Sequence, residues 1–180
     1  ASTGGTEAIR EVLSTLPENC PPVVIAQHIP PVFSTSFAAR MDACSLPKVC
    51  EAKDGQRIEQ GCVYIAPGDA HLTVKGTAGN YRCVLDNGPV VNRHKPSVEV
   101  LFDSVTAAAG SKAIAVMLTG MGADGAQAMV RMKEAGIYNI VQDEASSVVW
   151  GMPGAVVNLG ADSKVMPLNK ITGHMLSKIK

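Results

Sequence analysis

Three polar residues that lie far apart in the sequence have the side-chain types that acyl transfer requires. Ser2 precedes Thr3-Gly4-Gly5, His28 follows an apolar run at 23–26, and Asp124 lies in a glycine-rich segment after an apolar run at 113–118. A nucleophilic hydroxyl, a general base and an orienting carboxylate form a catalytic triad when a fold brings them together. The sequence therefore indicates Ser2, His28 and Asp124 as candidate catalytic residues of a hydrolase.

Each of these residues also has a simpler interpretation, which the sequence leaves open. A serine beside two glycines can cap a helix or belong to a phosphate-holding loop. His28 can be a hydrogen-bonded structural histidine, and Asp124 can be a turn residue or the N-cap of a helix. The combination of all three at the ends of separate strands favours the triad. The order Ser, His, Asp is no objection, because a triad is defined by its geometry.

Four further residues are candidates for supporting roles. The backbone N–H groups of Thr3 and Met121 lie in glycine-flanked turns and can stabilise an oxyanion, although Met121 can equally be a packing residue. Arg93 and His94 can contact a polar substrate, and a solvated basic loop is an equal alternative. The five cysteines include no C-x-x-C pair and no histidine at ligand spacing, which argues against a zinc site. The serine chemistry needs no metal or organic cofactor, and we expect none.

The candidate residues follow short apolar runs that are typical of buried parallel strands. Besides 23–26 and 113–118, the sequence predicts strands near 62–66, 137–141 and 164–166, and an antiparallel hairpin at 71–75 and 81–85. Amphipathic patterns predict helices at about 6–16, 32–44, 98–109 and 125–135, and a last helix capped by Asn169. In the second helix, Phe33, Phe37 and Met41 are expected to face inward.

The predicted strands and helices largely alternate, which is typical of a doubly wound sheet. We therefore predict an α/β fold in three layers, with a mainly parallel sheet, helices on both faces and an added antiparallel β-hairpin. Ligands in such folds gather beyond the carboxyl ends of the strands, where His28 and Asp124 are expected. A glycine-rich turn like that at Ser2 normally follows a buried strand, so we also expect a first strand upstream of Ala1.

Length and composition limit the classes of partner. The chain of 180 residues has the size of one domain, and we expect residues 1–180 to form a single catalytic domain. Sixteen basic residues balance sixteen acidic ones, which predicts no attraction to nucleic acid or anionic lipid. An odd number of cysteines favours reduced thiols in a cytoplasmic protein. The sequence shows no apolar run long enough for membrane insertion and no signal peptide.

Several longer motifs resemble one known family. They are Ala-Ser-Thr-Gly-Gly-Thr-Glu-Ala-Ile at 1–9, Gln-His-Ile-Pro-Pro at 27–31, Tyr-Ile-Ala-Pro-Gly-Asp at 64–69, Gly-Pro-Val-Val-Asn-Arg-His at 88–94, Leu-Thr-Gly-Met-Gly-Ala-Asp-Gly at 118–125 and Gln-Asp-Glu-Ala-Ser-Ser at 142–147. In sequence and order, from the first residue nearly to the last, they resemble the catalytic domain of the CheB family, the bacterial chemotaxis protein-glutamate methylesterases.

The resemblance implies a cytoplasmic serine hydrolase without a cofactor. Such an enzyme removes methyl esters from glutamates on the cytoplasmic helices of chemoreceptors, releases methanol, and deamidates certain receptor glutamines. The resemblance places the family's triad on Ser2, His28 and Asp124. Full-length members also carry an N-terminal receiver domain, which this sequence does not contain, so we expect either a catalytic fragment or a stand-alone enzyme.

Two other classes of function stay open at this point. A non-catalytic nucleotide or phosphate binder would hold an anion with the glycine loops at 2–5 and 119–125. That interpretation gives His28 no role, and no lysine follows Gly5 as it would in a P-loop. A regulatory adaptor would bind receptor helices without turning them over, and its binding would not depend on Ser2.

Overall fold

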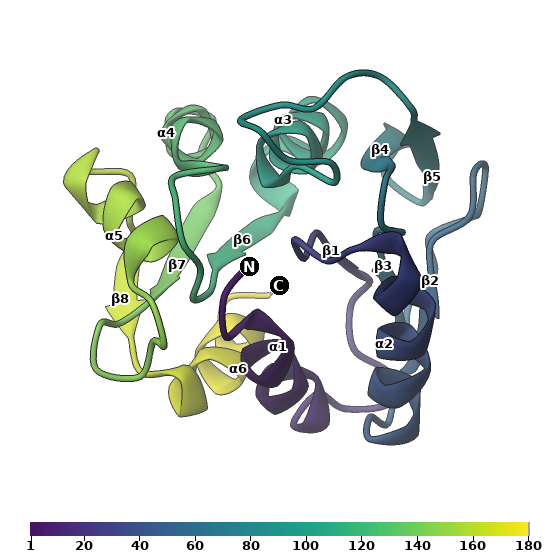
Figure 1. Ribbon diagram of the computed structural model, residues 1–180, viewed down its shortest axis with the longest axis horizontal. Coiled ribbons are helices and arrows are strands. Elements are labelled where there is room, and N and C mark those ends of the chain that lie inside the picture. Colours follow the sequence, from purple (N-terminus) through teal and green to yellow (C-terminus); the bar gives the residue numbers. More distant parts are fainter. Residues whose placement is uncertain (180) are drawn as a thin grey trace.

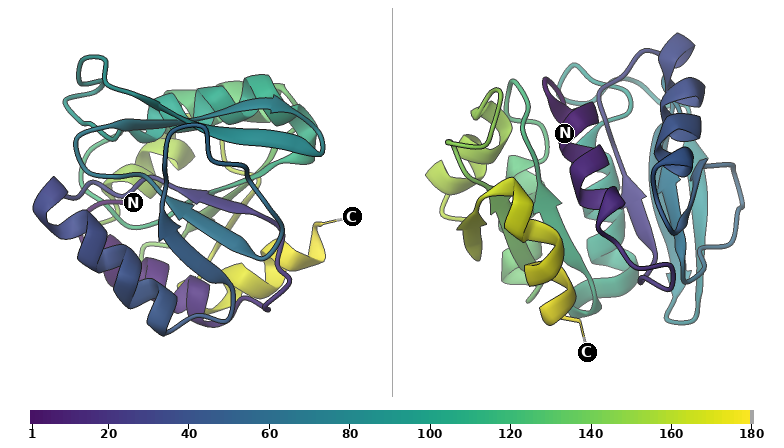
Figure 2. Two further views of the ribbon diagram at one scale, coloured as in Figure 1. Left: turned by 90° about the vertical axis from the view of Figure 1, so that its right-hand side faces the viewer. Right: turned by 90° about the horizontal axis from the view of Figure 1, so that it is seen from below.

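The computed structural model describes residues 1–179 and arranges them in three layers (Figure 1). Short strands form the middle layer. Helices α1 (Gly5–Ser14), α2 (Pro31–Ala43) and α6 (Leu168–Ser177) cover one face, and α3 (Val98–Ala109), α4 (Ala126–Glu134) and α5 (Gly151–Asn158) cover the other. Figure 2 shows α6, α1 and α2 side by side in one layer. The predicted α/β class with helices on both faces is confirmed.

Six parallel strands form two groups of three. The first group has the order β1-β3-β2, with β1 at Val23–Ile25, β2 at Lys48–Glu51 and β3 at Cys62–Ile65. The second has the order β6-β7-β8, with β6 at Ile114–Met117, β7 at Tyr138–Gln142 and β8 at Lys164–Met166. β1 and β6 are the inner edges of the two groups, and the start of the chain lies between them (Figure 1).

The predicted hairpin is also present. β4 (His71–Thr77) and β5 (Asn80–Asp86) pair antiparallel as a separate two-stranded sheet, which packs against α3. The N–H of Val74 donates to Ser104 Oγ at 2.9 Å and fixes β4 to that helix. A short 3-10 turn, Gly110–Lys112, connects α3 to β6.

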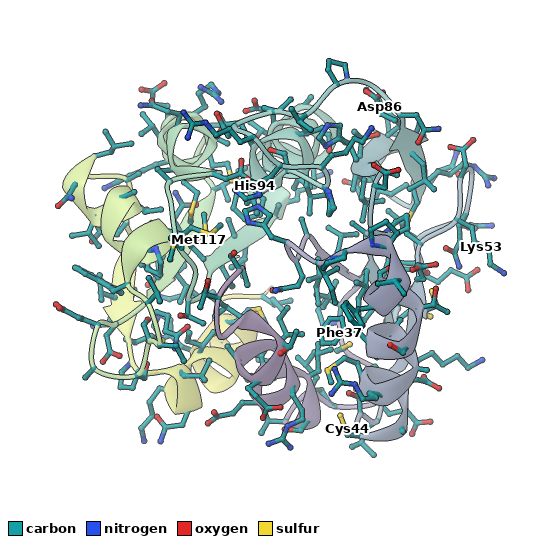
Figure 3. The ribbon with its side chains drawn as sticks, viewed as in Figure 1. Phe37, Cys44, Lys53, Asp86, His94 and Met117 are labelled. Carbon is teal, nitrogen blue, oxygen red and sulfur yellow. The ribbon has the colours of Figure 1, made fainter. Side chains whose placement is uncertain are left out.

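Alternation along the strands divides the interior into two cores. In β3, Val63 and Ile65 belong to the core under α1, α2 and α6, while Tyr64 belongs to the core under α3, α4 and α5. Neighbouring strand residues point to opposite faces, so a strand covered by helices on both sides must be apolar throughout. Figure 3 shows fully buried Phe37 pointing from α2 toward α1.

Three local predictions were wrong or incomplete. Phe33 is 57% exposed, because it lies in the first turn of α2, beyond the end of the strands that the helix covers. Asn169 does not cap the last helix; it lies inside α6, and Pro167 precedes the first residue of that helix. The sequence pattern does not predict β2, because its four residues begin with an exposed lysine and become a strand by pairing with β3. Within residues 1–179, no helix is long and apolar enough to cross a bilayer.

Candidate active site

Ser2 is held between the two groups of strands by hydrogen bonds to its backbone. Its N–H donates to the Thr119 carbonyl at 2.9 Å, just beyond the end of β6. Its carbonyl accepts from Gln27 Nε2 at 3.0 Å, just beyond the end of β1. The chain turns at Thr3 and Gly4 and enters α1 at Gly5. Ser2 therefore lies at the carboxyl edge of the strands and next to a helix N-terminus.

Two glycines permit this close approach. Gly4 adopts a φ of 78°, and a Cβ there would lie 2.6 Å from Val148 Cβ. A Cβ on Gly120 would lie 2.8 Å from Ser2 Cβ and 2.9 Å from Ser2 N. Both positions require glycine, because Gly4 needs left-handed backbone geometry and Gly120 needs the space.

His28 and Asp124 form a buried hydrogen-bonded pair. His28 Nε2 lies 2.7 Å from Asp124 Oδ2, and the two side chains are 7% and 1% exposed. An ionised carboxylate only accepts hydrogen bonds, so the shared proton belongs to Nε2 in this tautomer. His28 Nδ1 is buried and has no hydrogen-bond partner within residues 1–179. Nδ1 is therefore the ring nitrogen that can accept a proton.

Asp124 is surrounded by donors. They are His28 Nε2, Asn92 Nδ2, Ser97 Oγ and the backbone N–H groups of Val98 and Glu99. Burial alone would raise the pKa of Asp124, but hydrogen bonds from His28, Asn92, Ser97 and Val98 hold that pKa well below its usual range. Asp124 is therefore an anion at neutral pH, as an orienting carboxylate must be.

Asp124 also caps a helix, although not its own. The N–H groups of Val98 and Glu99 open α3, and they donate to Asp124 at 2.7 and 3.2 Å. Ser97 occupies the N-cap position, but its hydroxyl donates to Asp124 at 2.8 Å instead of accepting from α3. The Asp124 carboxylate therefore both binds His28, as a triad carboxylate would, and caps α3.

Ser2 and His28 are neighbours through their backbones. The N–H of His28 donates to the Ala1 carbonyl at 3.0 Å, while no hydrogen bond joins Ser2 Oγ to the imidazole. Such hydrogen bonds are often absent before substrate binds and form in the substrate complex. The catalytic role of Ser2 stays a prediction, and its placement beside the His28–Asp124 pair supports it.

The four supporting candidates lie around this centre in different ways. Within residues 1–179, the N–H groups of Thr3 and Met121 donate to no protein acceptor. The Met121 side chain is 63% exposed, so core packing does not explain this residue. Arg93 is exposed and forms no ion pair or side-chain hydrogen bond with the described residues. His94 lies against the His28 ring, with ring centroids 3.5 Å apart.

Comparison with known proteins decides the family. The family model described as CheB methylesterase matches residues 1–175. The chain belongs to the CheB methylesterase family. The crystal structure of the Thermotoga maritima CheB methylesterase catalytic domain is similar at a TM-score of 0.95 and 39% identity, covering 99% of this chain and 95% of that one.

Curated relatives of this chain are named for two activities. The protein-glutamate methylesterase/protein-glutamine glutaminase 2 of Saccharophagus degradans is 63% identical over 98% of this chain and 51% of its own length. The protein-glutamate methylesterase/protein-glutamine glutaminase of Hydrogenovibrio crunogenus is 55% identical over 100% of this chain and 48% of its own length. The chain spans about half the length of these relatives.

Several residues to which the sequence pattern assigns no role hold the candidate site together. Gln27 binds the Ser2 carbonyl, and Asn92 Nδ2 donates to Asp124 Oδ1 at 3.0 Å. Thr119 Oγ1 donates to the Thr3 carbonyl at 3.0 Å, and the N–H of Thr119 donates to Gln142 Oε1 at 2.8 Å. Their position in the sequence could have pointed to them, because each lies beside a candidate residue, just beyond a strand or at the last residue of one.

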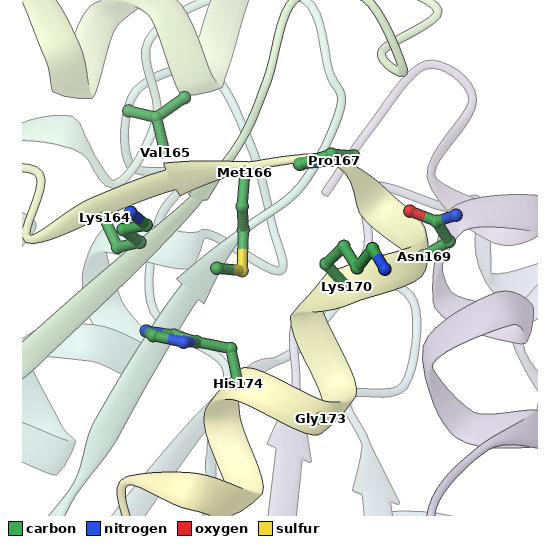
Figure 4. Close-up of a pocket in the computed structure, with 8 residues that line it drawn as sticks. All are labelled: Lys164, Val165, Met166, Pro167, Asn169, Lys170, Gly173 and His174. Atoms are coloured by element: carbon green, nitrogen blue, oxygen red, sulfur yellow. The ribbon is translucent and has the colours of Figure 1, made fainter.

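One hollow lies between β8 and α6, away from the candidate site. It has a volume of about 620 Å³, and Lys164, Lys170 and His174 are among the residues that line it (Figure 4). A smaller hollow of about 170 Å³ lies next to the Ser2 turn and includes Gly4 and Val148 in its lining. No group of three or more His, Cys, Asp or Glu side chains within residues 1–179 could hold a metal ion.

Proposed function

We propose that this chain is the catalytic domain of a protein-glutamate methylesterase that is also a protein-glutamine glutaminase. The observation that carries the proposal is the buried His28–Asp124 pair, placed beside Ser2 at the carboxyl edge of the strands in a member of the CheB family. A phosphate binder would leave that buried pair without a role. The names of the curated relatives support both activities.

In the proposed reaction, His28 transfers protons while Asp124 holds its tautomer. Ser2 Oγ attacks the γ-carbonyl carbon of a glutamyl methyl ester, and His28 Nδ1 takes the hydroxyl proton. Collapse of the tetrahedral intermediate breaks the ester C–O bond, and His28 returns the proton to the departing methoxide, which leaves as methanol. The same nitrogen then deprotonates a water molecule, which attacks the acyl-enzyme carbonyl. The bond from that carbon to Ser2 Oγ breaks, His28 returns the proton to Oγ, and glutamate leaves. A glutamine follows the same course, with ammonia in place of methanol.

The developing oxyanion needs donors that are already in place. The N–H groups of Thr3 and Met121, which donate to no acceptor within residues 1–179, are the proposed pair. An unpaired backbone donor aimed at developing charge lowers the barrier without any cost of reorganisation. The first turn of α1, which begins at Gly5, adds the partial positive charge of a helix N-terminus close to Ser2.

The proposed substrates are methylated glutamates and certain glutamines on the cytoplasmic helices of bacterial chemoreceptors, which places the enzyme in the cytoplasm and in chemotaxis adaptation. A receiver domain on the full-length protein is the proposed regulatory partner. The family motifs quoted above support these assignments.

The test is methanol release from methylated receptor membranes by the parent protein and by its Ser2→Ala variant. Ser36→Ala is the matched control, because Ser36 is exposed on α2 and bonds only within that helix. We expect Ser2→Ala to lose on the order of 10⁶ in kcat and Ser36→Ala to keep parent activity. A folded Ser2→Ala protein that still released methanol would remove Ser2 from the mechanism. Binding to receptors that survives in a parent protein without turnover would indicate an adaptor.

A further inference from the structure

One tight turn touches both members of the His28–Asp124 pair. Val91 and His94 exchange backbone hydrogen bonds of 3.0 and 2.9 Å, which makes 91–94 a two-residue turn. From this turn, Asn92 Nδ2 donates to Asp124 Oδ1 at 3.0 Å. His94 stacks on His28 with ring centroids 3.5 Å apart and planes 5° apart. The turn therefore holds the carboxylate at one end and covers the imidazole at the other.

Both central residues of this turn have a left-handed backbone. Asn92 and Arg93 have φ values of 51° and 67°. A two-residue turn of this kind needs positive φ at both positions, which asparagine adopts more readily than arginine. The contacts of Asn92 with Asp124 and of His94 with His28 add to the two backbone hydrogen bonds that hold the turn. Figure 3 shows His94 reaching toward the middle of the molecule.

We propose that His94 is a positioning residue for His28. Its ring holds the His28 imidazole in the orientation that joins Nε2 to Asp124 and leaves Nδ1 free for the Ser2 proton. When His28 becomes an imidazolium, the neutral face of His94 lies against the new positive charge. The proposal rests on the proposed function and adds to it a requirement that His94 be uncharged during turnover.

Electrostatics favour a positive charge on only one of the two stacked rings, and that ring is His28. Two cations 3.5 Å apart repel strongly, and Asp124 is hydrogen-bonded to His28 and not to His94. Burial lowers the pKa of His94, and so do the neighbouring His28 and the Ala1 amino group. The Asp124 carboxylate raises it, but the net shift is downward. Because the folded-state pKa of His94 is lowered, its contribution to stability is present above about pH 6.5 and is lost as the pH falls through the folded-state pKa.

The decisive experiment compares His94→Phe and His94→Ala with the parent. Phenylalanine keeps a flat ring against His28 but cannot titrate, and alanine removes the ring. We expect His94→Ala to lower kcat by about 10², the effect of a misplaced catalytic group, with KM little changed. We expect His94→Phe to recover most of that rate. On the acid side of its pH–rate profile, kcat should depend on one ionisable group fewer than in the parent.

His174→Ala is the matched control. His174 bonds Tyr138 on the far side of the molecule, so its loss is expected to leave the pH–rate profile unchanged. Three outcomes would overturn the inference: parent kcat in His94→Ala, equal losses in both His94 variants, or a rise in KM that accounts for the whole effect. Nitrogen NMR of the parent supplies a test that needs neither turnover nor variants. It should show His28 protonated on Nε2 and His94 uncharged at neutral pH, and a proton on Nδ1 of neutral His28 would also overturn the inference.

These readouts separate the two proposals. Serine-dependent methanol release by the parent, together with parent kcat in His94→Ala, would leave the esterase standing and remove the role of His94. No release by a folded parent would remove the esterase, while the NMR measurement would still report the arrangement of the two rings.

Discussion

Single residues at this site serve more than one purpose, and Gly120 is an example. Its carbonyl accepts hydrogen bonds from the N–H groups of Gly151 and Met152, which fix the loop after β6 to the start of α5. Its missing side chain leaves the space in which Ser2 lies. The position of the candidate nucleophile therefore depends on a residue that does no chemistry.

A methyl group added at Gly120 should displace Ser2. In Gly120→Ala the new Cβ would lie 2.4 Å from Met152 Sδ and 2.9 Å from Ser2 N, so the Ser2 backbone has to move. We expect kcat for methyl-ester hydrolysis to fall by about 10² or more and the free energy of unfolding to fall by about 1–3 kcal/mol.

Gly173→Ala is the matched control for that change. Gly173 lies inside α6, and nothing lies within 4 Å of its added Cβ. Alanine in a helix interior should raise the free energy of unfolding by about 0.5–1 kcal/mol and leave the rate unchanged. Equal rates in the two variants would show that Ser2 tolerates displacement. Kinetic assays and urea denaturation of the three proteins measure both effects.

At the scale of elements, the N-terminus of α3 depends on a carboxylate from another loop. Most capped helices satisfy their first N–H groups with a residue just before the helix. Here Asp124 reaches α3 from the loop before α4, and the same oxygens hold His28 and Asn92. The catalytic geometry and the docking of α3 are therefore coupled through one charge.

This coupling predicts an acid-sensitive contribution to stability. The pKa of Asp124 is lower in the fold than in the unfolded chain, so its contribution is fully present above about pH 4 and is lost as the pH falls toward the folded-state pKa. At pH 6, Asp124→Asn should cost about 2–4 kcal/mol of unfolding free energy, because an amide group would face donors. Urea denaturation at pH 6, 4 and 3 should show that difference shrinking as the pH falls.

Asp162→Asn is the control for the acid-sensitive effect. The Asp162 carboxylate makes no ion pair or hydrogen bond within residues 1–179, and only its backbone carbonyl is bound, by Lys133. This variant should follow the parent at every pH. A cost of Asp124→Asn that did not change with pH would contradict the assignment of the lowered pKa to this network.

At the scale of the whole molecule, the two groups of strands meet at the start of the chain. β1 and β6 do not pair with each other, and Ala1 and Ser2 hydrogen-bond to the loops that follow both. The Ala1 amino group donates to the Ala26 carbonyl at 3.1 Å, and burial lowers its pKa to about 5 while Asp124 opposes that shift. The start of the chain therefore holds the loops after β1 and β6 next to each other.

The sequence by itself determined the features that depend on local patterns. Apolar runs ending in polar residues located the ends of β1 and β6, and with them the places of His28 and Asp124. Turn residues located the β4–β5 hairpin, and Gly136, with a φ of 84°, marks the end of α4. These features were predictable because side-chain periodicity and backbone preference act over a few residues.

Tertiary structure decided the contacts between loops that are distant in the sequence. The preferred tautomer of His28, the capping of α3 by Asp124 and the stack of His94 on His28 each join segments separated by 25 residues or more. Such contacts depend on how the strands are ordered and on the left-handed turn at Asn92 and Arg93, which no glycine at those positions marks in the sequence. The exposure of Phe33 has the same cause, because a helical pattern does not show where the sheet beneath the helix ends.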